Sequence, residues 1–284
     1  MVSVVIPAYN EEESVGQTVV HIREILKGVV HEIVVVDDGS RDSTGERARS
    51  AGARVIRHPH NAGYGASLKT GIKAAVNDTI VITDADGTYP NVRILELIEE
   101  YKKGFNMVVG ARTGEHYRES FLKGSLRFFL KWIVEYSTGR TIPDINSGLR
   151  VFSRSQIIPY FKHLCNTFSF TTSVTLAYMM TGRFVAYVPV PYNKRVGNSH
   201  VRLFRDTLRV MQYIVQAVLY YNPLKMFLLM SGVILGLSCV SLLLTLVLKF
   251  FSLFYIGIGG ILVSVIIFAM GLLADLLRQI MEKD

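Results

Sequence analysis

The chain has 284 residues, of which 50% are apolar and 19% are charged, and its net charge is +8. Ordinary soluble domains carry about 25% charged residues, so this composition favours a membrane protein and excludes a disordered chain. The two cysteines, Cys165 and Cys239, are too few and too far apart for a disulfide framework or a zinc site, and they indicate a reducing, cytosol-facing compartment.

Short apolar strands alternate with helices through the first 110 residues. We expect strands at 2–7, 32–36, 54–57, 79–83 and 107–110, and helices from about residue 10 and at 42–50, 65–75 and 92–102. This alternation predicts an α/β fold with a mostly parallel sheet that is covered on both faces. Ligands of such sheets lie beyond the carboxyl ends of the strands.

Polar side chains follow the ends of these strands: Tyr9 to Glu11, Asp37 and Asp38, Asp84 to Asp86, and Arg112. Carboxylates gathered on one sheet edge repel one another and resist ionisation unless a cation neutralises them. An Asp-x-Asp segment at a strand end offers the oxygen ligands that Mg²⁺ or Mn²⁺ prefers, with a substrate diphosphate completing the shell. The segment Asp84-Ala85-Asp86 is therefore predicted to be functional rather than a solvated turn.

Positive charge is concentrated in residues 112–209, which hold 15 Lys and Arg against 5 Asp and Glu. Such a block suits nucleic acid, anionic lipid or a phosphorylated substrate. No nucleic-acid motif accompanies it, and an apolar tail follows it. We therefore expect a membrane and phosphate groups as partners, and no nucleic acid.

Two uncharged apolar stretches, 226–248 and 250–274, lie near the end of the chain. At 1.5 Å per residue even the shorter one spans roughly 35 Å, which exceeds a bilayer core of about 30 Å. A few residues around Lys249 separate them, so they predict a tight transmembrane hairpin of helices at about 225–248 and 251–274. Two buried core helices are the alternative.

Basic side chains flank this hairpin: Arg205, Arg209 and Lys225 precede it, and Arg278 and Lys283 follow it. The positive-inside rule then places both ends of the hairpin in the cytoplasm. Residues 1–9 are too short for the apolar region and cleavage site of a signal peptide. We expect a multi-pass cell-membrane protein whose N-terminal domain and both termini are cytoplasmic.

Residues 201–221 repeat apolar side chains every three to four positions, with Arg202, Arg205 and Arg209 nearby. This pattern is typical of an amphipathic helix that lies along the membrane interface, and it equally fits a packed helix of the soluble part. We expect a soluble domain over 1–200, a juxtamembrane amphipathic helix over 201–222 and a membrane part over 223–284.

Six segments occur in an order that carries a family resemblance. They are VVIPAYNEE at 4–12, IVVVDDGSRDST at 33–44, HNAGYGASLKTG at 60–71, VITDADGTYP at 81–90, VVGAR at 108–112 and DINSGLRVF at 144–152. With these segments the chain resembles the family 2 glycosyltransferases, which have the Rossmann-like GT-A fold. More narrowly, it is similar to polyprenyl-phosphate glycosyltransferases, such as dolichol-phosphate mannose synthases and their bacterial glucosyl relatives. The resemblance covers residues 1–200, and a tail of two spanning helices is typical of a subset.

The resemblance implies a metal-dependent, inverting enzyme that uses Mg²⁺ or Mn²⁺. It would move a sugar from a nucleoside-diphosphate sugar, of the UDP-glucose or GDP-mannose type, to dolichyl or undecaprenyl phosphate on the cytosolic face. Relatives with this hairpin imply a homo-oligomer. One alternative is a glycosyltransferase with another lipid or glycan acceptor, although the Gln-x-x-Arg-Trp segment of processive synthases is absent and Trp132 is the one tryptophan. Another is a sugar-nucleotide sensor without turnover, against which the intact acidic and basic motifs argue.

The resemblance also implies a nucleotide pocket lined by Pro7, Tyr9 and Glu11, with Tyr9 against the base. Val36 and Asp38 would meet the base and the ribose. The loop Asn61-Ala62-Gly63-Tyr64-Gly65 precedes a helix, and its glycines permit a close backbone approach to a nucleotide. A purely structural strand-to-helix loop is the equal alternative.

On the sugar side, the resemblance implies that Asp84 contacts the ribose or a water of the metal shell, and that Asp86 binds the metal directly. Ala85, between them, belongs to the same nucleotide-sugar site. Thr88 stands where some relatives have a Gln ligand, and it would act through its hydroxyl, its carbonyl or a water. Arg112 would reach the diphosphate or the sugar, and a salt bridge to a local acid is its structural alternative.

On the acceptor side, the resemblance implies that Lys194, Arg195 and His200, in YNKRVGNSH, hold the acceptor phosphate. His200 stands where relatives have Lys, and a neutral imidazole would bind phosphate less well at high pH. Asp144 occupies the family's candidate base position, and it is either a base or a residue that orients a cation. Arg150 is either functional or structural.

Overall fold

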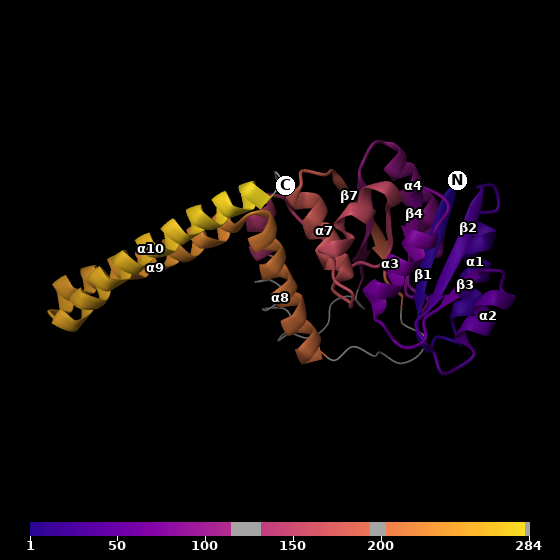
Figure 1. Ribbon diagram of the computed structural model, residues 1–284, viewed down its shortest axis with the longest axis horizontal. Coiled ribbons are helices and arrows are strands. Elements are labelled where there is room, and N and C mark those ends of the chain that lie inside the picture. The colour runs from indigo at the N-terminus through magenta and orange to yellow at the C-terminus, as the bar shows by residue number, and fades with distance from the viewer. Residues whose placement is uncertain (115–131, 194–202, 282–284) are drawn as a thin grey trace. The chain divides into compact units, whose positions relative to one another are not determined.

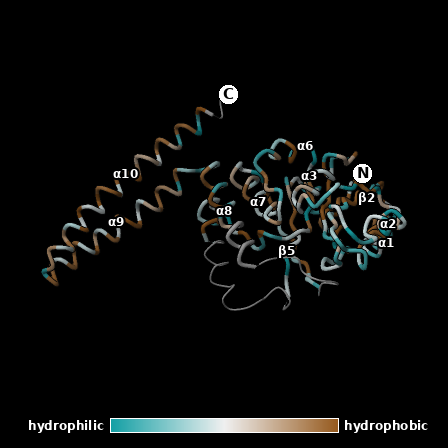
Figure 2. The backbone as a smooth tube through the Cα atoms, turned by 60° about the horizontal axis from the view of Figure 1, so that its bottom comes forward, coloured by the Kyte–Doolittle hydropathy of each residue, from teal (hydrophilic) through white to brown (hydrophobic). Residues whose placement is uncertain are grey.

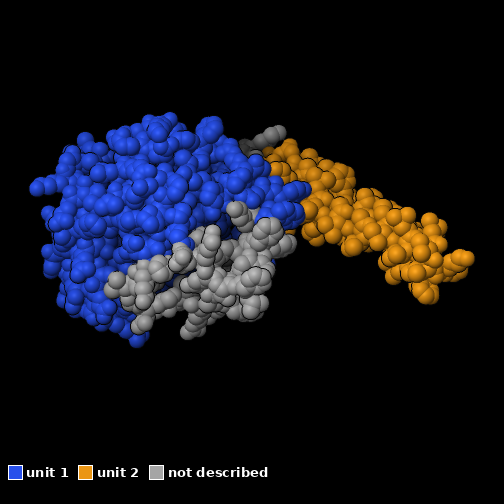
Figure 3. All heavy atoms as spheres, turned by 180° about the vertical axis from the view of Figure 1, so that it is seen from behind, with its two compact units in different colours: residues 1–214 blue, residues 215–284 orange. Residues whose placement is uncertain are grey.

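The computed structural model describes residues 1–114, 132–193 and 203–281, with only the backbone described for residues 203–210 and 281. The chain divides into two compact units, residues 1–214 and residues 215–284, which are coloured separately in Figure 3. The boundary falls within helix α8 (Leu203–Tyr221), which forms where the sequence predicts an amphipathic helix.

A seven-stranded sheet forms the centre of the first unit (Figure 1). Its spatial order is β3 (Arg54–Arg57), β2 (His31–Asp37), β1 (Val2–Ala8), β4 (Thr79–Ile82), β6 (Arg150–Ser153), β5 (Met107–Thr113) and β7 (Val185–Pro191). The neighbouring strands are parallel except at β6, which runs antiparallel to both β4 and β5. The prediction of a mostly parallel sheet is confirmed.

Helices connect the parallel strands. In the first half they are α1 (Val15–Ile25), α2 (Thr44–Ser50), α3 (Tyr64–Ala74), the 3-10 helix η1 (Asn91–Arg93) and α4 (Ile94–Lys102). The helix predicted at 92–102 is thus divided between η1 and α4. The second half adds α6 (Arg154–Ile157), η3 (Ile158–Lys162) and α7 (Phe170–Met180).

Side chains of β1 alternate between the two faces of the sheet. Val4 and Ile6 belong to a core that they share with residues of α1, α2 and α4. Val5 points to the other face, where α3 packs so closely that a Cβ on Gly71 would lie 2.4 Å from Val5 Cγ1. Helices therefore cover both faces of the sheet, as the alternation of strands and helices predicts.

The reversed direction of β6 decides which residues reach the edge where the parallel strands end. Arg150, its first residue, pairs with Ile82 near the end of β4 and with Val109 in β5. The segment that precedes β6, residues 144–149, therefore lies at the edge where the parallel strands end. This antiparallel strand was not predicted from the sequence.

The second unit contains two long helices, α9 (Pro223–Leu248) and α10 (Phe251–Met281). Within the described residues, two helices are long and apolar enough to cross a membrane, and they span Pro223–Leu248 and Phe251–Ile280. Figure 2 shows hydrophobic residues along both of them. Lys249 makes the turn between them in a left-handed conformation, with φ of +54°. Helix α10 continues past the predicted end at residue 274.

Small residues line the contact between α9 and α10. Ser231 donates a hydrogen bond to the carbonyl of Ser264 (2.9 Å), and Ser241 donates one to the carbonyl of Leu253 (2.8 Å). A Cβ on Gly260 would lie 2.0 Å from Ser238 Oγ. Close approach of small residues with interhelical hydrogen bonds is how apolar helices associate without a hydrophobic driving force between them.

Gly260 and its neighbour Gly259 are a matched pair for mutagenesis, because a Cβ would clash at Gly260 and not at Gly259. We expect Gly260→Leu to destabilise the helix pair by about 1–3 kcal/mol through overpacking. Gly259→Leu should change stability by less than about 0.5 kcal/mol, because nothing lies within 4 Å of a Cβ at Gly259. Thermal unfolding in detergent, followed by circular dichroism, measures both variants. Equal midpoints would contradict the close crossing at Gly260.

Candidate active site

The carboxyl ends of four parallel strands carry the predicted site residues to one edge of the sheet. Tyr9 follows β1, Asp38 follows β2 and Asp84 lies just after β4, while Arg112 is the penultimate residue of β5. These strands run side by side or are separated only by β6. The convergence that the sequence predicted is therefore present in the fold.

The loops after β1 and β2 are bonded to each other. Asn10, with φ of +54°, donates its backbone N–H to Ser40 Oγ (3.0 Å), and its side-chain oxygen accepts from the N–H of Arg41 (2.9 Å). The backbone N–H of Glu11 donates to Thr44 Oγ1 (2.8 Å). These bonds fix the loop that carries Tyr9 and Glu11. Both residues are half-buried.

Three residues of the predicted nucleotide pocket are core residues. Pro7 and Val36 are buried register partners in β1 and β2. Ala85 is 3% exposed, and its carbonyl accepts a hydrogen bond from Thr18 Oγ1 of α1 (3.0 Å). These three residues belong to the core next to this edge of the sheet. Their contact with a nucleotide stays a prediction.

Asp38 is buried and holds the loop that leads to α3. Its Oδ1 lies 2.7 Å from His58 Nδ1 and accepts from the N–H of Ala62 (2.9 Å). Its Oδ2 accepts from the N–H of Gly63 (2.8 Å). The loop that was predicted to approach a nucleotide thus has a structural role as well, and the nucleotide contact of Asp38 stays a prediction.

Asp84 and Asp86 are each held by neighbouring hydroxyl groups. Asp84 Oδ1 accepts from the Tyr64 hydroxyl (2.9 Å). Asp86, 6% exposed, accepts through Oδ1 from the backbone N–H (3.1 Å) and the hydroxyl (2.6 Å) of Thr88. Thr88 therefore orients Asp86, and its role as a metal ligand stays a prediction.

The donor chemistry at this edge fits a divalent cation. Two carboxylates separated by one residue are the oxygen ligands that Mg²⁺ and Mn²⁺ prefer. Among the residues that the structure describes, no group of three or more His, Cys, Asp or Glu is placed to hold a metal ion. Asp84 and Asp86 therefore fit the oxygen-ligand chemistry of a divalent cation.

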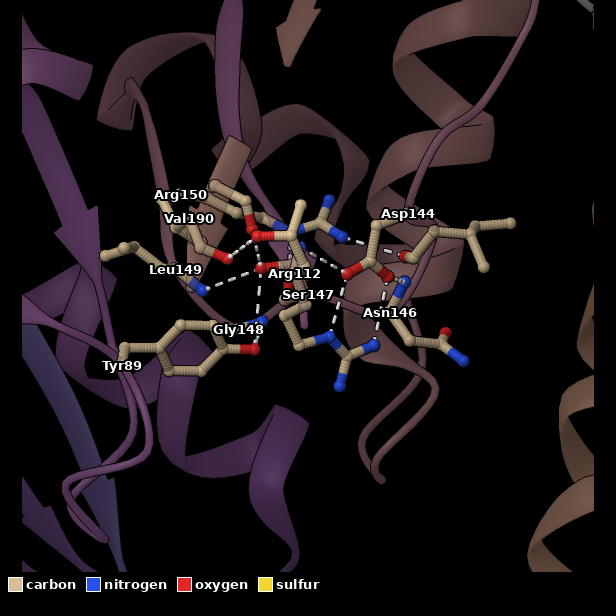
Figure 4. A network of polar contacts seen from close by, with 12 residues as sticks. Tyr89, Arg112, Asp144, Asn146, Ser147, Gly148, Leu149, Arg150 and Val190 are labelled. Atoms are coloured by element: carbon tan, nitrogen blue, oxygen red, sulfur yellow. Dashed lines mark hydrogen bonds and ion pairs between the residues drawn. The ribbon is translucent and has the colours of Figure 1, made fainter. Parts of the chain in front are cut away.

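Arg112 and Asp144 form a buried, bidentate ion pair (Figure 4). Arg112 Nε donates to Asp144 Oδ2 (2.7 Å) and Nη2 donates to Oδ1 (2.9 Å). The backbone N–H groups of Arg112 and Asn146 add bonds of 3.1 and 3.0 Å to the same carboxylate. The Asp144 side chain is 1% exposed and that of Arg112 is 16% exposed.

Burial alone would raise the pKa of Asp144, but the hydrogen bonds and the charge of Arg112 outweigh burial and lower it. Both carboxylate oxygens already accept hydrogen bonds from charged or backbone donors. Such a group is a weak proton acceptor. Of the two roles expected for Asp144, the geometry favours orientation of a cation, which here is the guanidinium of Arg112.

A chain of aromatic contacts runs from this pair to Asp84. Arg112 Cζ lies 5.3 Å from the centroid of the Tyr192 ring, which meets the Tyr89 ring edge to face at 5.5 Å. The Tyr89 hydroxyl accepts from the N–H of Gly148 (2.7 Å), and a Cβ on Gly148 would lie 2.8 Å from Asp84 Oδ1. No role for these aromatic residues was predicted from the sequence, although Tyr89 lies inside the segment VITDADGTYP.

Comparisons with known proteins identify the family of this chain. Residues 3–166 match the family described as glycosyl transferase family 2. The chain belongs to this family. It is therefore a glycosyltransferase, as the six sequence motifs indicate.

The chain is 29% identical to the dolichyl-phosphate hexose transferase of Haloferax volcanii, over 76% of this chain and 93% of that protein. It is 39% identical to the dolichol-phosphate mannosyltransferase of Pyrococcus furiosus, over 44% of this chain and 39% of that protein. A solved structure of glucosyl-3-phosphoglycerate synthase from Mycobacterium tuberculosis, in complex with Mg²⁺ and UDP, superposes with a TM-score of 0.64 at 20% identity. That match covers 77% of this chain and 79% of the other, and it shows the GT-A fold.

Arg150 has a structural role in this glycosyltransferase. It is fully buried and donates to the carbonyls of Ser147 (2.7 Å) and Ile145 (2.8 Å) and to Thr175 Oγ1 (2.7 Å). Its guanidinium thereby fixes the loop between Asp144 and β6. Of the two expectations for Arg150, the structural one is confirmed.

The predicted acceptor residues Lys194, Arg195 and His200 lie outside the described residues. The segment that leads to them starts at the same sheet edge. After β7, the N–H of Tyr192 donates to the carbonyl of Thr113 (3.1 Å) and the N–H of Asn193 donates to the carbonyl of Thr88 (2.9 Å). Binding of an acceptor phosphate by these three residues stays a prediction.

The ion pair predicts a pH-dependent contribution to stability. Asp144→Asn should lower stability by about 2 kcal/mol at neutral pH, because it removes the negative charge that pairs with Arg112. The folded-state pKa of Asp144 is lowered, so its contribution is complete above the unfolded-state pKa of about 3.9 and is lost as the pH falls through the lower folded-state value. Thermal midpoints of both proteins in detergent, measured from pH 7 to pH 3, test this. A difference that stays constant down to the lowest pH would contradict it.

Proposed function

We propose that this glycosyltransferase moves a sugar from a nucleoside-diphosphate sugar to a polyprenyl phosphate at a membrane surface. The observation that carries the proposal is the sheet edge to which the end of β4 brings Asp84 and Asp86 and the end of β5 brings Arg112, in a chain that also has two helices long enough to cross a membrane. The relatives named as dolichyl-phosphate and dolichol-phosphate transferases support the acceptor class.

The donor binds at the strand ends in this account. The half-buried ring of Tyr9 stacks against the base, Asp38 meets the base or ribose, and the loop after β1 is held rigid by its bonds to Ser40 and Arg41. Asp84 and Asp86 would hold a divalent cation, Mg²⁺ or Mn²⁺. When bound, such a cation neutralises negative charge on the leaving diphosphate.

Arg112 compensates negative charge on the leaving diphosphate from the protein side. Asp144 fixes the direction of its guanidinium, so little reorganisation is needed as the bond to the leaving group breaks. Because Asp144 has a lowered pKa and two engaged oxygens, it does not take a proton in this account.

A phosphate acceptor needs no base to activate it. Polyprenyl phosphate is already an anion at neutral pH, so its oxygen needs orientation and charge compensation rather than deprotonation. Lys194, Arg195 and His200 would supply these positive charges. Attack from the face opposite the diphosphate inverts the anomeric centre and yields a β-linked lipid-phosphate sugar from an α-linked donor.

We assign the membrane arrangement on the same basis. Helices α9 and α10 span the bilayer, α8 lies along its surface, and Lys225 and Arg278 keep the catalytic unit and both termini in the cytoplasm. Several copies of the chain would assemble in the membrane, as the resemblance implies.

Transfer in liposomes tests the proposal. The purified full chain is incubated with polyprenyl phosphate, Mn²⁺ or Mg²⁺ and a panel of radiolabelled UDP- and GDP-sugars, with EDTA as a control. Label that enters the lipid phase with one donor, and is lost with EDTA, is the expected result. Donor hydrolysis without lipid labelling would direct the search to another lipid or glycan acceptor, and no reaction with any donor would favour a sensor.

The two aspartates give the corresponding prediction. Asp84→Ala and Asp86→Ala should each lower transfer by about 10²-fold or more, because each removes an anionic ligand from the site. Glu99→Gln is the control, since Glu99 is an exposed carboxylate of α4 paired with Lys102 (2.7 Å) and lies outside the candidate site. Initial rates of lipid labelling measure all three. Activity that persists in the double variant of Asp84 and Asp86 would contradict the proposed function.

A further inference from the structure

The Asp84 carboxylate is confined from two sides. On one side the Tyr64 hydroxyl donates to Oδ1 at 2.9 Å. On the other side the backbone of Gly148 lies so close that a Cβ there would be 2.8 Å from Oδ1 and 2.9 Å from Oδ2. A hydrogen bond and a steric wall together restrict the orientation of this side chain.

Tyr64 is itself fixed by its place at the start of α3. The preceding residue, Gly63, has φ of +105° and donates its N–H to Asp38 Oδ2 (2.8 Å). A Cβ on Gly63 would lie 2.6 Å from the carbonyl oxygen of Asn166, so this turn requires glycine. The Tyr64 ring stacks on Phe168, with centroids 5.6 Å apart and planes 17° apart. The loop that binds Asp38 thereby also sets where the Tyr64 hydroxyl points.

The wall formed by Gly148 belongs to the other half of the site. Its N–H donates to the Tyr89 hydroxyl, and the neighbouring Ser147 donates through Oγ to the carbonyl of Gly110 in β5 (2.6 Å). Figure 4 shows Tyr89 and Gly148 together with Arg112 and Asp144. Asp84 is therefore held between the loop that carries Tyr64 and the segment that carries Asp144.

We propose that Tyr64 is a positioning residue, whose hydroxyl holds Asp84 in the orientation in which it meets the donor and its divalent cation. A phenol suits this task because a neutral donor orients a carboxylate without cancelling the negative charge that attracts the cation. A lysine ammonium at the same place would compete with that cation. This inference rests on the proposed function and adds to it a residue that acts through Asp84.

The test compares Tyr64→Phe with Tyr178→Phe. Tyr64→Phe removes the hydroxyl and keeps the ring that stacks on Phe168. Tyr178 is the matched control, because it is fully buried and its hydroxyl has no hydrogen-bond partner within the described part of the chain. Binding of Mn²⁺ in the presence of UDP is followed by electron paramagnetic resonance, and kcat and KM for the donor are measured separately.

We expect Tyr64→Phe to weaken Mn²⁺ binding by about tenfold, as loss of a residue that orients a metal ligand does. The kcat/KM for the donor should fall by a similar factor, and Tyr178→Phe should match the wild type in both measurements. Gly148→Ala, which crowds Asp84 from the opposite wall, provides a second variant. It should weaken Mn²⁺ binding in the same direction.

The outcomes separate this inference from the proposed function. Wild-type Mn²⁺ affinity and kcat/KM in a folded Tyr64→Phe protein would overturn the positioning role, and so would an equal loss in Tyr178→Phe. Absence of lipid labelling in the wild type would overturn the proposed acceptor. The Mn²⁺ measurement would then still decide whether Tyr64 acts through Asp84.

Discussion

The bidentate pair of Arg112 and Asp144 is the interaction on which the candidate site depends. Arg112 lies near the end of the parallel strand β5, Asp144 lies in the loop that enters the reversed strand β6, and their pairing joins the two elements at the edge of the candidate site. The Asp144 side chain is 1% exposed, and a buried carboxylate is costly to leave unpaired. The ion pair therefore fixes the loop that carries Asp144 to Arg112. The same ion pair holds the Arg112 guanidinium at the sheet edge where the proposed anionic substrate would bind.

The reversed strand extends this constraint to the acidic half of the site. Because β6 starts at the edge where β4 and β5 end, the loop before it passes beside Asp84. Gly148 lies against the Asp84 carboxylate, and Tyr89 links Gly148 to Tyr192 and thus to Arg112. Buried Arg150 fixes the carbonyls of this loop. A continuous series of contacts through Gly148, Tyr89 and Tyr192 therefore joins Asp84 to Arg112.

Much of the first half of this fold can be predicted from sequence, because each apolar strand there is followed by a polar end and a helix of the expected length. Asp84, Asp86 and Arg112 were predicted on that basis, and they lie at the ends of β4 and β5. The direction of β6 could not be predicted. Its four residues are all buried, and this pattern is the same for a parallel and an antiparallel strand. Only the pairing with β4 and β5 decides the direction. The partners of Asp38 and Asp84 were missed for a related reason. His58, Gly63 and Tyr64 lie 20 or more residues away in sequence from the acid that each contacts, and the folded sheet brings them together.

The most direct test of this account is a double-mutant cycle on Arg112 and Asp144, with kcat and KM for the nucleotide sugar measured for Arg112→Lys, Asp144→Asn and the double variant. If Asp144 acts by orienting Arg112, the two single variants lose similar transition-state stabilisation and the double variant is no worse than the more damaged single one. If instead Asp144→Asn abolishes kcat with donor KM unchanged while Arg112→Lys stays active, Asp144 is a base and the account is wrong.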